Sequence, residues 1–333
     1  MVKKWISFVL CVAMIAMVLV LPATAETEDE VKIALCIANT LGDRSFFDSA
    51  HEGLMELEED YGIIASVVEC KSDASAFEPA LVEAGETNDI VVAVGWEFWT
   101  PLENVVPQMP DTKFIFIDNG MDGMGDNLVS VIFADNEGSF LAGYIAMKQS
   151  QTATVGVVGG GDDETINNFI VGYKQGALYA NPEGTVLDPI YTNHDYDSPD
   201  KGKEAALALY GRGADVVFHV AGKTGLGVFE AAKETQNYAI GVDGDQKYLN
   251  PDVILCSMMK NVGASISSVI GMYLVDGIFE GGQILNMDMS SEMVDVVYGD
   301  DSMPQQISPE LKAEVEELKQ KIIAGEIVVE STR

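Results

Sequence analysis

Residues 31–61 read VKIALCIANTLGDRSFFDSAHEGLMELEEDY, and they contain the first strand, loop and helix of the chain. The run KIALCIA at 32–38 is typical of a strand buried on both faces, and residues 47–60 have the spacing of an amphipathic helix. Between them, a polar loop places Phe46 and Phe47 side by side, close to Asp43. One ring can begin the core of the helix, which leaves the other available for a flat ligand.

Strands and helices alternate in this way along most of the chain. In the first half, strands are predicted at 32–38, 65–70, 89–95 and 113–118, with helices at 47–60, 76–87, 99–107 and 137–150. The series then restarts, with strands at 153–160, 185–192, 215–220, 238–243 and 253–259 and helices at 164–180, 199–212, 225–235 and 262–279. A helix that begins after Ser308 and ends at Gly325 follows, and then a short closing strand. We therefore predict an α/β protein with two doubly wound parallel sheets.

Length and composition favour a globular protein of two domains. The chain has 333 residues, of which 47% are hydrophobic, so a large core can form. Its formal net charge of −34 would repel the phosphates of a nucleic acid, and we expect no nucleic-acid partner.

The first residues have the features of a secretory signal. Lys3 and Lys4 precede an apolar stretch at 5–21, and the sequence ATA at 23–25 fits a small-residue cleavage site. We predict a signal peptide at residues 1–25. The alternative is an uncleaved membrane anchor, because the apolar stretch approaches the length that spans a bilayer. Both alternatives place the rest of the chain outside the cytoplasm, in the periplasm or at the cell surface.

Cysteine and histidine spacing gives no metal-binding motif. The part of the chain after residue 25 holds Cys36, Cys70 and Cys256, without a CxxC pair, and its three histidines are scattered. Cys36 lies in the first strand, where a buried, inert thiol is usual. A Cys36–Cys70 disulfide is the alternative.

The loops that follow the strands are the candidate binding site, because ligands of open parallel sheets bind beyond the carboxyl ends of the strands. These loops combine aromatic rings, which stack on flat groups, with polar side chains that bind hydroxyl groups. For Trp96 and Phe98 core packing is the alternative role, and for Lys260 it is a hinge salt bridge. The candidate ligand-binding residues are Asp43, Phe46, Trp96, Phe98, Asn167, Tyr196, Thr224, Gly225, Asp243, Asp245 and Lys260.

Motifs for phosphate binding and for catalysis are poorly supported. The loop VGGGDDET lacks the GxGxxG spacing and its acidic residues would repel a phosphate, while AGKTG lacks the spacing of a P-loop. No GxSxG is present, and no Cys and His pairing is indicated. Asp243 and Asp245 are able in principle to hold Mg²⁺, but no partner motif accompanies them. We predict a binding protein without a cofactor or metal, and not an enzyme.

Six segments resemble the basic membrane protein family, whose members are substrate-binding proteins of ABC importers similar to the purine nucleoside receptor. GDRSFFDSAHEGL resembles the family signature GDKSFNQSAYEG. NEGSFLAGYIA, DSPDKGKEAA, GADVVFHVAGKTGLGVFEAAKE, AIGVDGDQ and SMMKNV follow in the family's order, so that the resemblance covers about residues 31–330. It implies a type I periplasmic-binding-protein fold, with two lobes joined by a three-crossover hinge. Lobe I would comprise residues 31–148 and 262–285, and lobe II residues 150–260 and 287–333.

The resemblance also implies roles for particular residues. Phe46 would stack on a nucleoside base, with Tyr196 as the opposing ring and Asp43 near the base or its loop. Asp243 or Asp245 would bind the ribose hydroxyl groups, assisted by Lys260. The implied partners are a nucleoside, with purine nucleosides favoured, and an ABC permease in the membrane.

The chain departs from the family pattern at two places. Phe47 stands where the family has an asparagine, and the loop GGGDDETINNF replaces the usual GGMDxPxI, so that Asn167 and Asn168 would supply other polar contacts. Another flat ligand, such as riboflavin, is therefore an alternative. A sensor that presents its ligand to a membrane receptor and a secreted nucleoside hydrolase are two further alternatives.

Overall fold

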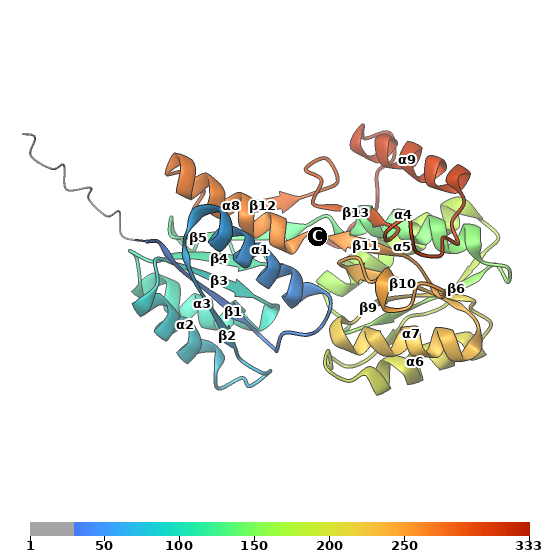
Figure 1. The fold of residues 1–333 in the computed structure, drawn as a ribbon, viewed down its shortest axis with the longest axis horizontal. Coiled ribbons are helices and arrows are strands. Elements are labelled where there is room, and N and C mark those ends of the chain that lie inside the picture. Colours follow the sequence, from blue (N-terminus) through green and yellow to red (C-terminus); the bar gives the residue numbers. More distant parts are fainter. Residues whose placement is uncertain (1–29) are drawn as a thin grey trace, which may run out of the picture. The chain divides into compact units, whose positions relative to one another are not determined.

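Two largely parallel sheets, each covered by helices on both faces, make up residues 30–333, which are the residues that the computed structural model describes (Figure 1). Residues Val31–Arg333 form one compact unit. The predicted signal peptide at residues 1–25 lies outside the described residues. Among the described residues, no helix combines the length and the apolar character needed to cross a membrane.

The first sheet has the strand order β12-β5-β4-β3-β1-β2, and all its pairings are parallel. Side chains of β1 alternate between two cores: Ile33, Leu35 and Ile37 face one, and Ala34 and Cys36 face the other. Helices α1 and α8 cover the first face, and α2 and α3 cover the second. The elements are β1 (Lys32–Ile37), α1 (Phe46–Tyr61), β2 (Ile64–Glu69), α2 (Phe77–Thr87), β3 (Ile90–Val94), η1 (Trp96–Phe98), α3 (Trp99–Val105), η2 (Val106–Gln108), β4 (Lys113–Ile117), β5 (Leu128–Phe133), α8 (Val262–Asp276) and β12 (Ile284–Met287).

The second sheet has the order β13-β11-β10-β9-β6-β7, with β8 also paired to β6. Its edge strand β13 runs antiparallel to β11. Helices α4 and α5 pack on one face of this sheet, and α6 and α7 on the other. The elements are α4 (Asp135–Gln149), β6 (Thr154–Gly159), α5 (Glu164–Ala180), β7 (Thr185–Val186), β8 (Ile190–Tyr191), α6 (Pro199–Gly211), β9 (Val216–Val220), η3 (Gly222–Gly225), α7 (Leu226–Thr235), β10 (Tyr238–Asp243), η4 (Lys247–Leu249), β11 (Ile254–Lys260), β13 (Val294–Val297) and α9 (Pro309–Ile323).

The chain passes three times between the two sheets: from β5 to α4, from β11 to α8, and from β12 to β13. This is the type I periplasmic-binding-protein fold, and the prediction of an α/β protein with two doubly wound sheets and three crossovers is confirmed. We call the two halves lobe I (the first sheet with its helices) and lobe II (the second sheet with its helices).

Helix α4 lies in lobe II, whereas the predicted boundary at residue 148 placed it in lobe I. Its backbone packs directly against α5, because glycines stand where the two helices touch. A Cβ atom on Gly143 would lie 2.0 Å from the carbonyl oxygen of Tyr173, and one on Gly176 would lie 1.9 Å from that of Phe140. The first crossing therefore falls between Phe133 and Asp135.

Three local predictions need correction. The predicted strand 185–192 is two short strands, β7 and β8, separated by a segment with Pro189, which has no N–H to donate to a ladder. The strands β5, β12 and β13 were not predicted. No strand follows α9: the amides of Glu326 and Ile327 bond back to the Lys321 carbonyl, and residues 328–333 are held to α5 by side-chain hydrogen bonds. The predicted cap of α9 is confirmed, since Ser308 Oγ accepts a hydrogen bond from the Leu311 amide at 3.2 Å.

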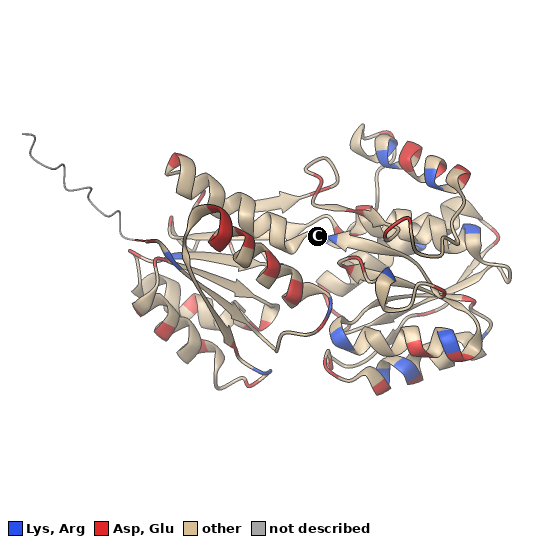
Figure 2. Cartoon of the chain, in the orientation of Figure 1, with Lys and Arg blue, Asp and Glu red and all other residues tan. Residues whose placement is uncertain are grey.

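Cys36, Cys70 and Cys256 are free and buried, so the alternative of a Cys36–Cys70 disulfide is wrong. Burial raises the pKa of the Cys36 thiol to about 12 and that of Cys70 to about 11. Acidic residues recur along α1, where Figure 2 colours several ribbon segments red, and Glu52, Glu56 and Glu59 of this helix are exposed.

Candidate functional site

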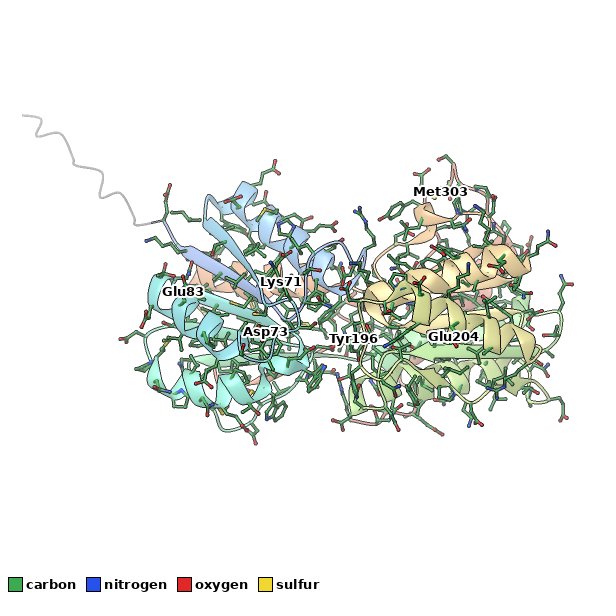
Figure 3. The ribbon with its side chains drawn as sticks, turned by 90° about the horizontal axis from the view of Figure 1, so that it is seen from below. Lys71, Asp73, Glu83, Tyr196, Glu204 and Met303 are labelled. Carbon is green, nitrogen blue, oxygen red and sulfur yellow. The ribbon has the colours of Figure 1, made fainter. Side chains whose placement is uncertain are left out.

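A cavity of about 1160 Å³ lies between the lobes, and its walls are the loops at the carboxyl ends of both sheets. Tyr196 lies between the two sheet regions in Figure 3, and Lys71 lies on the lobe I side. The wall contains both aromatic rings and carboxylates. The lining side chains used below are Asp43, Phe46, Phe47, Trp96, Glu97, Asp118, Asn119, Asp163, Phe169, His194, Tyr196, Asp243 and Lys260.

Lys260 ends β11 at the floor of the cavity and is buried. Its Nζ atom lies 2.6 Å from Asp118 Oδ1 and 3.4 Å from Asp135 Oδ1. Three rings surround the ammonium group, with their centroids at 5.0 to 5.1 Å, namely those of Phe46, Phe133 and Phe169. Burial alone would lower the lysine pKa, but the nearby carboxylates Asp118 and Asp135 and the third carboxylate Asp243 raise it overall. The lysine is therefore a charged donor on the cavity floor.

Asp118 and Asp243 occupy corresponding positions in the two lobes. Asp118 directly follows β4, and Asp243 is the last residue of β10. Both have positive φ angles, 80° for Asp118 and 65° for Asp243, a backbone region that non-glycine residues rarely adopt. Such strained backbone is common where a side chain must point into a site. Asp118 forms an ion pair with Lys260 at 2.6 Å, and the charge of Asp243 also raises the pKa of this lysine.

Asp243 also joins the two lobes. Its Oδ2 atom accepts a hydrogen bond from the hydroxyl of Ser45, and Gln246 Nε2 donates to the Arg44 carbonyl at 3.0 Å nearby. Burial raises the pKa of Asp243 to about 7, although Lys260 and Ser45 act in the opposite direction. Asp243 therefore takes up or releases a proton near neutral pH.

Asp43 holds the loop that presents Phe46. Its two oxygens accept hydrogen bonds from the backbone amides of Ser45, Phe47 and Asp48 at 3.1, 2.9 and 3.1 Å, which satisfies donors at the start of α1. Burial nevertheless raises its pKa to about 6. With both oxygens bonded to this loop, its main role is to orient the loop.

The outer end of the cavity carries a second aromatic group. The Trp96 and His194 rings, one from each lobe, have their centroids 5.8 Å apart, and the Tyr196 ring lies 6.5 Å from that of His194. Glu97 and Asp163 stand beside these rings. Burial, and to a lesser extent Asp118 and Asp163, raise the pKa of Glu97. This end of the cavity is acidic and favours neutral or positively charged groups.

Five predicted ligand residues do not line this cavity. Phe98 is fully buried against Phe77, with ring centroids 5.2 Å apart, because η1 turns it into the core while Trp96 faces the cavity. Asn167 bonds to Asp162 and accepts a hydrogen bond from Tyr191.

The other three belong to lobe II. Thr224 is buried and donates to the carbonyl of Asp195 at 2.8 Å. Gly225 is buried against the His219 ring, which would clash with a Cβ atom there. Asp245 accepts from the Lys247 amide at 3.0 Å and lines a separate cavity of about 210 Å³.

The structure brings Asp43, Phe46, Trp96, Tyr196, Asp243 and Lys260 into one cavity, as predicted, and adds residues that were missed. Asp118 carried a signal, since it closes the apolar run KFIFI in the same way that Asp243 closes YAIGV. Phe169 and Asp163 had no comparable signal. The contact of any of these residues with a ligand stays a prediction. Among residues 30–333, no group of three or more His, Cys, Asp or Glu side chains is placed to hold a metal ion.

Comparisons with known proteins agree with this architecture. The family model for PnrA-like ABC transporter substrate-binding proteins matches residues 30–333. Basic membrane protein A1 of Borrelia garinii subsp. bavariensis is 34% identical over 308 residues, which cover 91% of this chain and 89% of the relative. Basic membrane protein A of Borreliella burgdorferi is 34% identical over 307 residues, with coverage of 91% and 88%.

Solved structures show the same fold. An ABC transporter solute-binding protein from Aeropyrum pernix K1 superposes with a TM-score of 0.79 at 27% identity, covering 90% of this chain and 92% of that one. An ABC transporter solute-binding protein from Agrobacterium vitis, bound with alpha-D-tagatopyranose, has a TM-score of 0.64 at 15% identity, with coverage of 81% and 95%. The second likeness concerns the fold alone.

Proposed function

This chain belongs to the family of PnrA-like ABC transporter substrate-binding proteins, and we propose that it binds a nucleoside, with purine nucleosides favoured, for import by an ABC permease. The interlobe cavity is the proposed site. The protein would act outside the cytoplasm, after cleavage of residues 1–25 or anchored through them. Family membership supports the general role, and the identity of the ligand rests on the side chains of the cavity.

The arrangement around Lys260 is the observation that carries this proposal. A flat base would stack on the Phe46 ring, which Asp43 orients through the loop before α1. The ribose hydroxyl groups would donate to Asp118 and Asp243 and accept from Lys260, because paired carboxylates and an ammonium group complement a diol. Tyr196 would form the opposite wall.

Closure of the lobes is the proposed mechanism. The Ser45–Asp243 and Arg44–Gln246 hydrogen bonds connect the lobes beside the cavity, so they can form only when the lobes approach. A ligand held by side chains of both lobes binds the closed state better than the open one and shifts the population toward it. The permease would recognise that closed state.

Isothermal titration calorimetry with inosine, adenosine, guanosine, cytidine and riboflavin tests the proposal. We expect purine nucleosides to bind more tightly than cytidine and riboflavin. Trp96 gives an independent optical signal, because it lines the cavity and a stacked ligand would quench it. Trp99→Phe, which removes a tryptophan outside the cavity wall, is the control that should leave this quenching intact. No binding by any of the four nucleosides would refute the ligand class. Release of free base during incubation would instead indicate a hydrolase.

A larger flat solute such as riboflavin is the second candidate, and two observations favour it. The cavity of about 1160 Å³ exceeds the usual range of roughly 300–1,000 Å³ for small-molecule pockets. Phe47 also adds a ring to its wall at a place where the family pattern has an amide. Binding of riboflavin at least tenfold tighter than inosine would favour this candidate over the first.

A further inference from the structure

Side-chain hydrogen bonds hold residues 328–333, which we call the strap, against the helices of lobe II. Gln175 on α5 donates to the carbonyl of Val328 at 3.0 Å and accepts from the amide of Glu330 at 2.7 Å. Asn168 on the same helix accepts from the Ser331 hydroxyl at 2.9 Å and from the Thr332 amide at 3.1 Å. The strap thus follows α5 toward its N-terminus, which borders the cavity. This path brings Arg333 to the strand ends behind the cavity wall.

Arg333 reaches from the strap into lobe I. Its guanidinium group donates to the carbonyl oxygens of Asp118 at 3.0 Å and of Phe133 at 3.3 Å, and to the Thr165 hydroxyl at 2.5 Å. It also lies 3.8 Å from the Asp118 carboxylate and 3.6 Å from that of Asp135. The side chain is only 14% exposed. One arginine therefore joins the ends of β4 and β5 in lobe I to α5 in lobe II.

The charges around Asp135 connect the contacts of Arg333 with the ligand site. Asp135 is fully buried, and its two oxygens face Lys260 at 3.4 Å and Arg333 at 3.6 Å, with no closer hydrogen-bond partner among residues 30–333. Burial raises the pKa of Asp135 to about 6, while Lys260 and Arg333 lower it and Asp118 raises it. Without Arg333, an ionised Asp135 would have Lys260 as its one remaining cation among these groups. Asp135 would then compete with Asp118 for the lysine.

We propose that Arg333 is a positioning residue of the cleft. It fixes the strand end that carries Asp118, and it neutralises Asp135 so that Lys260 remains paired with Asp118. For the ligand itself this inference rests on the nucleoside proposal. It goes beyond that proposal because Arg333 does not line the cavity and acts through residues that do.

The test compares Arg333→Met, Arg333→Lys and the double variant Asp135→Asn/Arg333→Met with the wild type, and measures inosine affinity from pH 5.5 to pH 8.5. At high pH, ionised Asp135 should draw Lys260 away, so we expect Arg333→Met to bind about tenfold or more weakly, as for the loss of one charge-assisted hydrogen bond. At low pH, Asp135 takes up a proton and the loss should shrink. The Asp135→Asn substitution imitates that protonated form, so the double variant should lose the pH dependence of the defect. Arg333→Lys keeps a cation and should recover most of the wild-type profile. Comparing each variant with the wild type at the same pH cancels the titration of Asp243 and Asp43.

Arg212→Met is the matched control, because Arg212 is exposed at the end of α6, away from the cleft, and should change nothing. The inference is overturned if Arg333→Met binds like the wild type, or if its defect is equal at every pH and persists in the double variant. Unfolding of the ligand-free protein provides a readout that does not depend on the nucleoside. Arg333→Met should lower the midpoint temperature more at pH 8.5 than at pH 5.5, and an equal loss at both would refute the electrostatic role. Failure of every nucleoside to bind would refute the proposed function and leave this second readout valid.

Discussion

Replacing Phe46 with alanine should weaken nucleoside binding by roughly 5- to 150-fold. The ring is half-buried at the start of α1 and lines the cavity, and its centroid lies 5.1 Å from the Lys260 Nζ atom. Stacking of a base on an aromatic side chain is worth about 1–3 kcal/mol, and each 1.4 kcal/mol corresponds to about a tenfold change in affinity. The truncation also removes the contact with the Phe47 ring, whose centroid is 5.2 Å away. Since the side chain is only partly buried, we expect the free energy of unfolding to fall by about 1–3 kcal/mol, less than for a fully buried phenylalanine.

Two further variants separate binding from folding. Phe46→Tyr keeps a ring in the same place and should retain an affinity within about threefold of the wild type, a change below 1 kcal/mol. Phe98→Leu removes a fully buried ring that does not line the cavity, so it should lower stability without lowering affinity. Calorimetric titration with inosine and urea denaturation measure the two quantities. A folded Phe46→Ala protein that binds inosine with wild-type affinity would show that the ring does not touch the ligand.

Three other predictions follow from charge and packing. Because the pKa of Asp243 is raised to about 7 in the folded protein against 3.8 for a free side chain, the folded state retains a proton that the unfolded state releases. The free energy of unfolding of the ligand-free protein should therefore fall as the pH rises from about 4 to 7. In urea denaturation at several pH values, Asp243→Asn should flatten part of this slope. An unchanged slope would contradict the raised pKa of Asp243. Carboxylates outnumber lysines in the cavity wall and would repel a phosphate group. In a competition titration, inosine 5′-monophosphate should therefore bind at least about tenfold more weakly than inosine. Equal affinities would show that the acidic wall does not affect the binding of a charged ligand. Gly143→Ala places a methyl group 2.0 Å from the Tyr173 carbonyl and should lower the free energy of unfolding by about 1–3 kcal/mol. Gly211→Ala is the control: no atom lies within 4 Å of its Cβ, and the free energy of unfolding should stay equal or rise. Similar losses in both variants would show that α4 and α5 can move apart to accommodate the methyl group.

The architecture was predictable because strands buried on both faces appear as continuous apolar runs. The helix predicted at 164–180 and the strand predicted at 238–243 match α5 and β10 to the residue. Such local patterns do not reveal which lobe an element joins. Helix α4 follows lobe I in the chain, yet it packs on α5 through glycine contacts about 30 residues away, and nothing in its own periodicity indicates that partner.

The candidate site was predictable at strand ends and less so within turns. Phe46, Asp243 and Lys260 were placed correctly in one cavity because parallel strands bring their carboxyl ends to one edge. Trp96 and Phe98 are two residues apart in the same short turn. Their side chains point in different directions, so Trp96 lines the cavity and Phe98 is buried in the core. Arg333 was beyond prediction, because its position depends on a path set by side-chain bonds to α5 rather than by any repeating pattern.

The three buried thiols of the described chain have a practical use. Burial raises the pKa of Cys36 and Cys256 to about 12 and that of Cys70 to about 11. At neutral pH almost none of these thiols is ionised, so a maleimide reagent would react with them very slowly. A protein lacking the first 29 residues could therefore carry one engineered surface cysteine on each lobe, and a fluorescent donor and acceptor could be attached without first removing the native cysteines. Single-molecule energy transfer would then follow the distance between the lobes directly while solute is added.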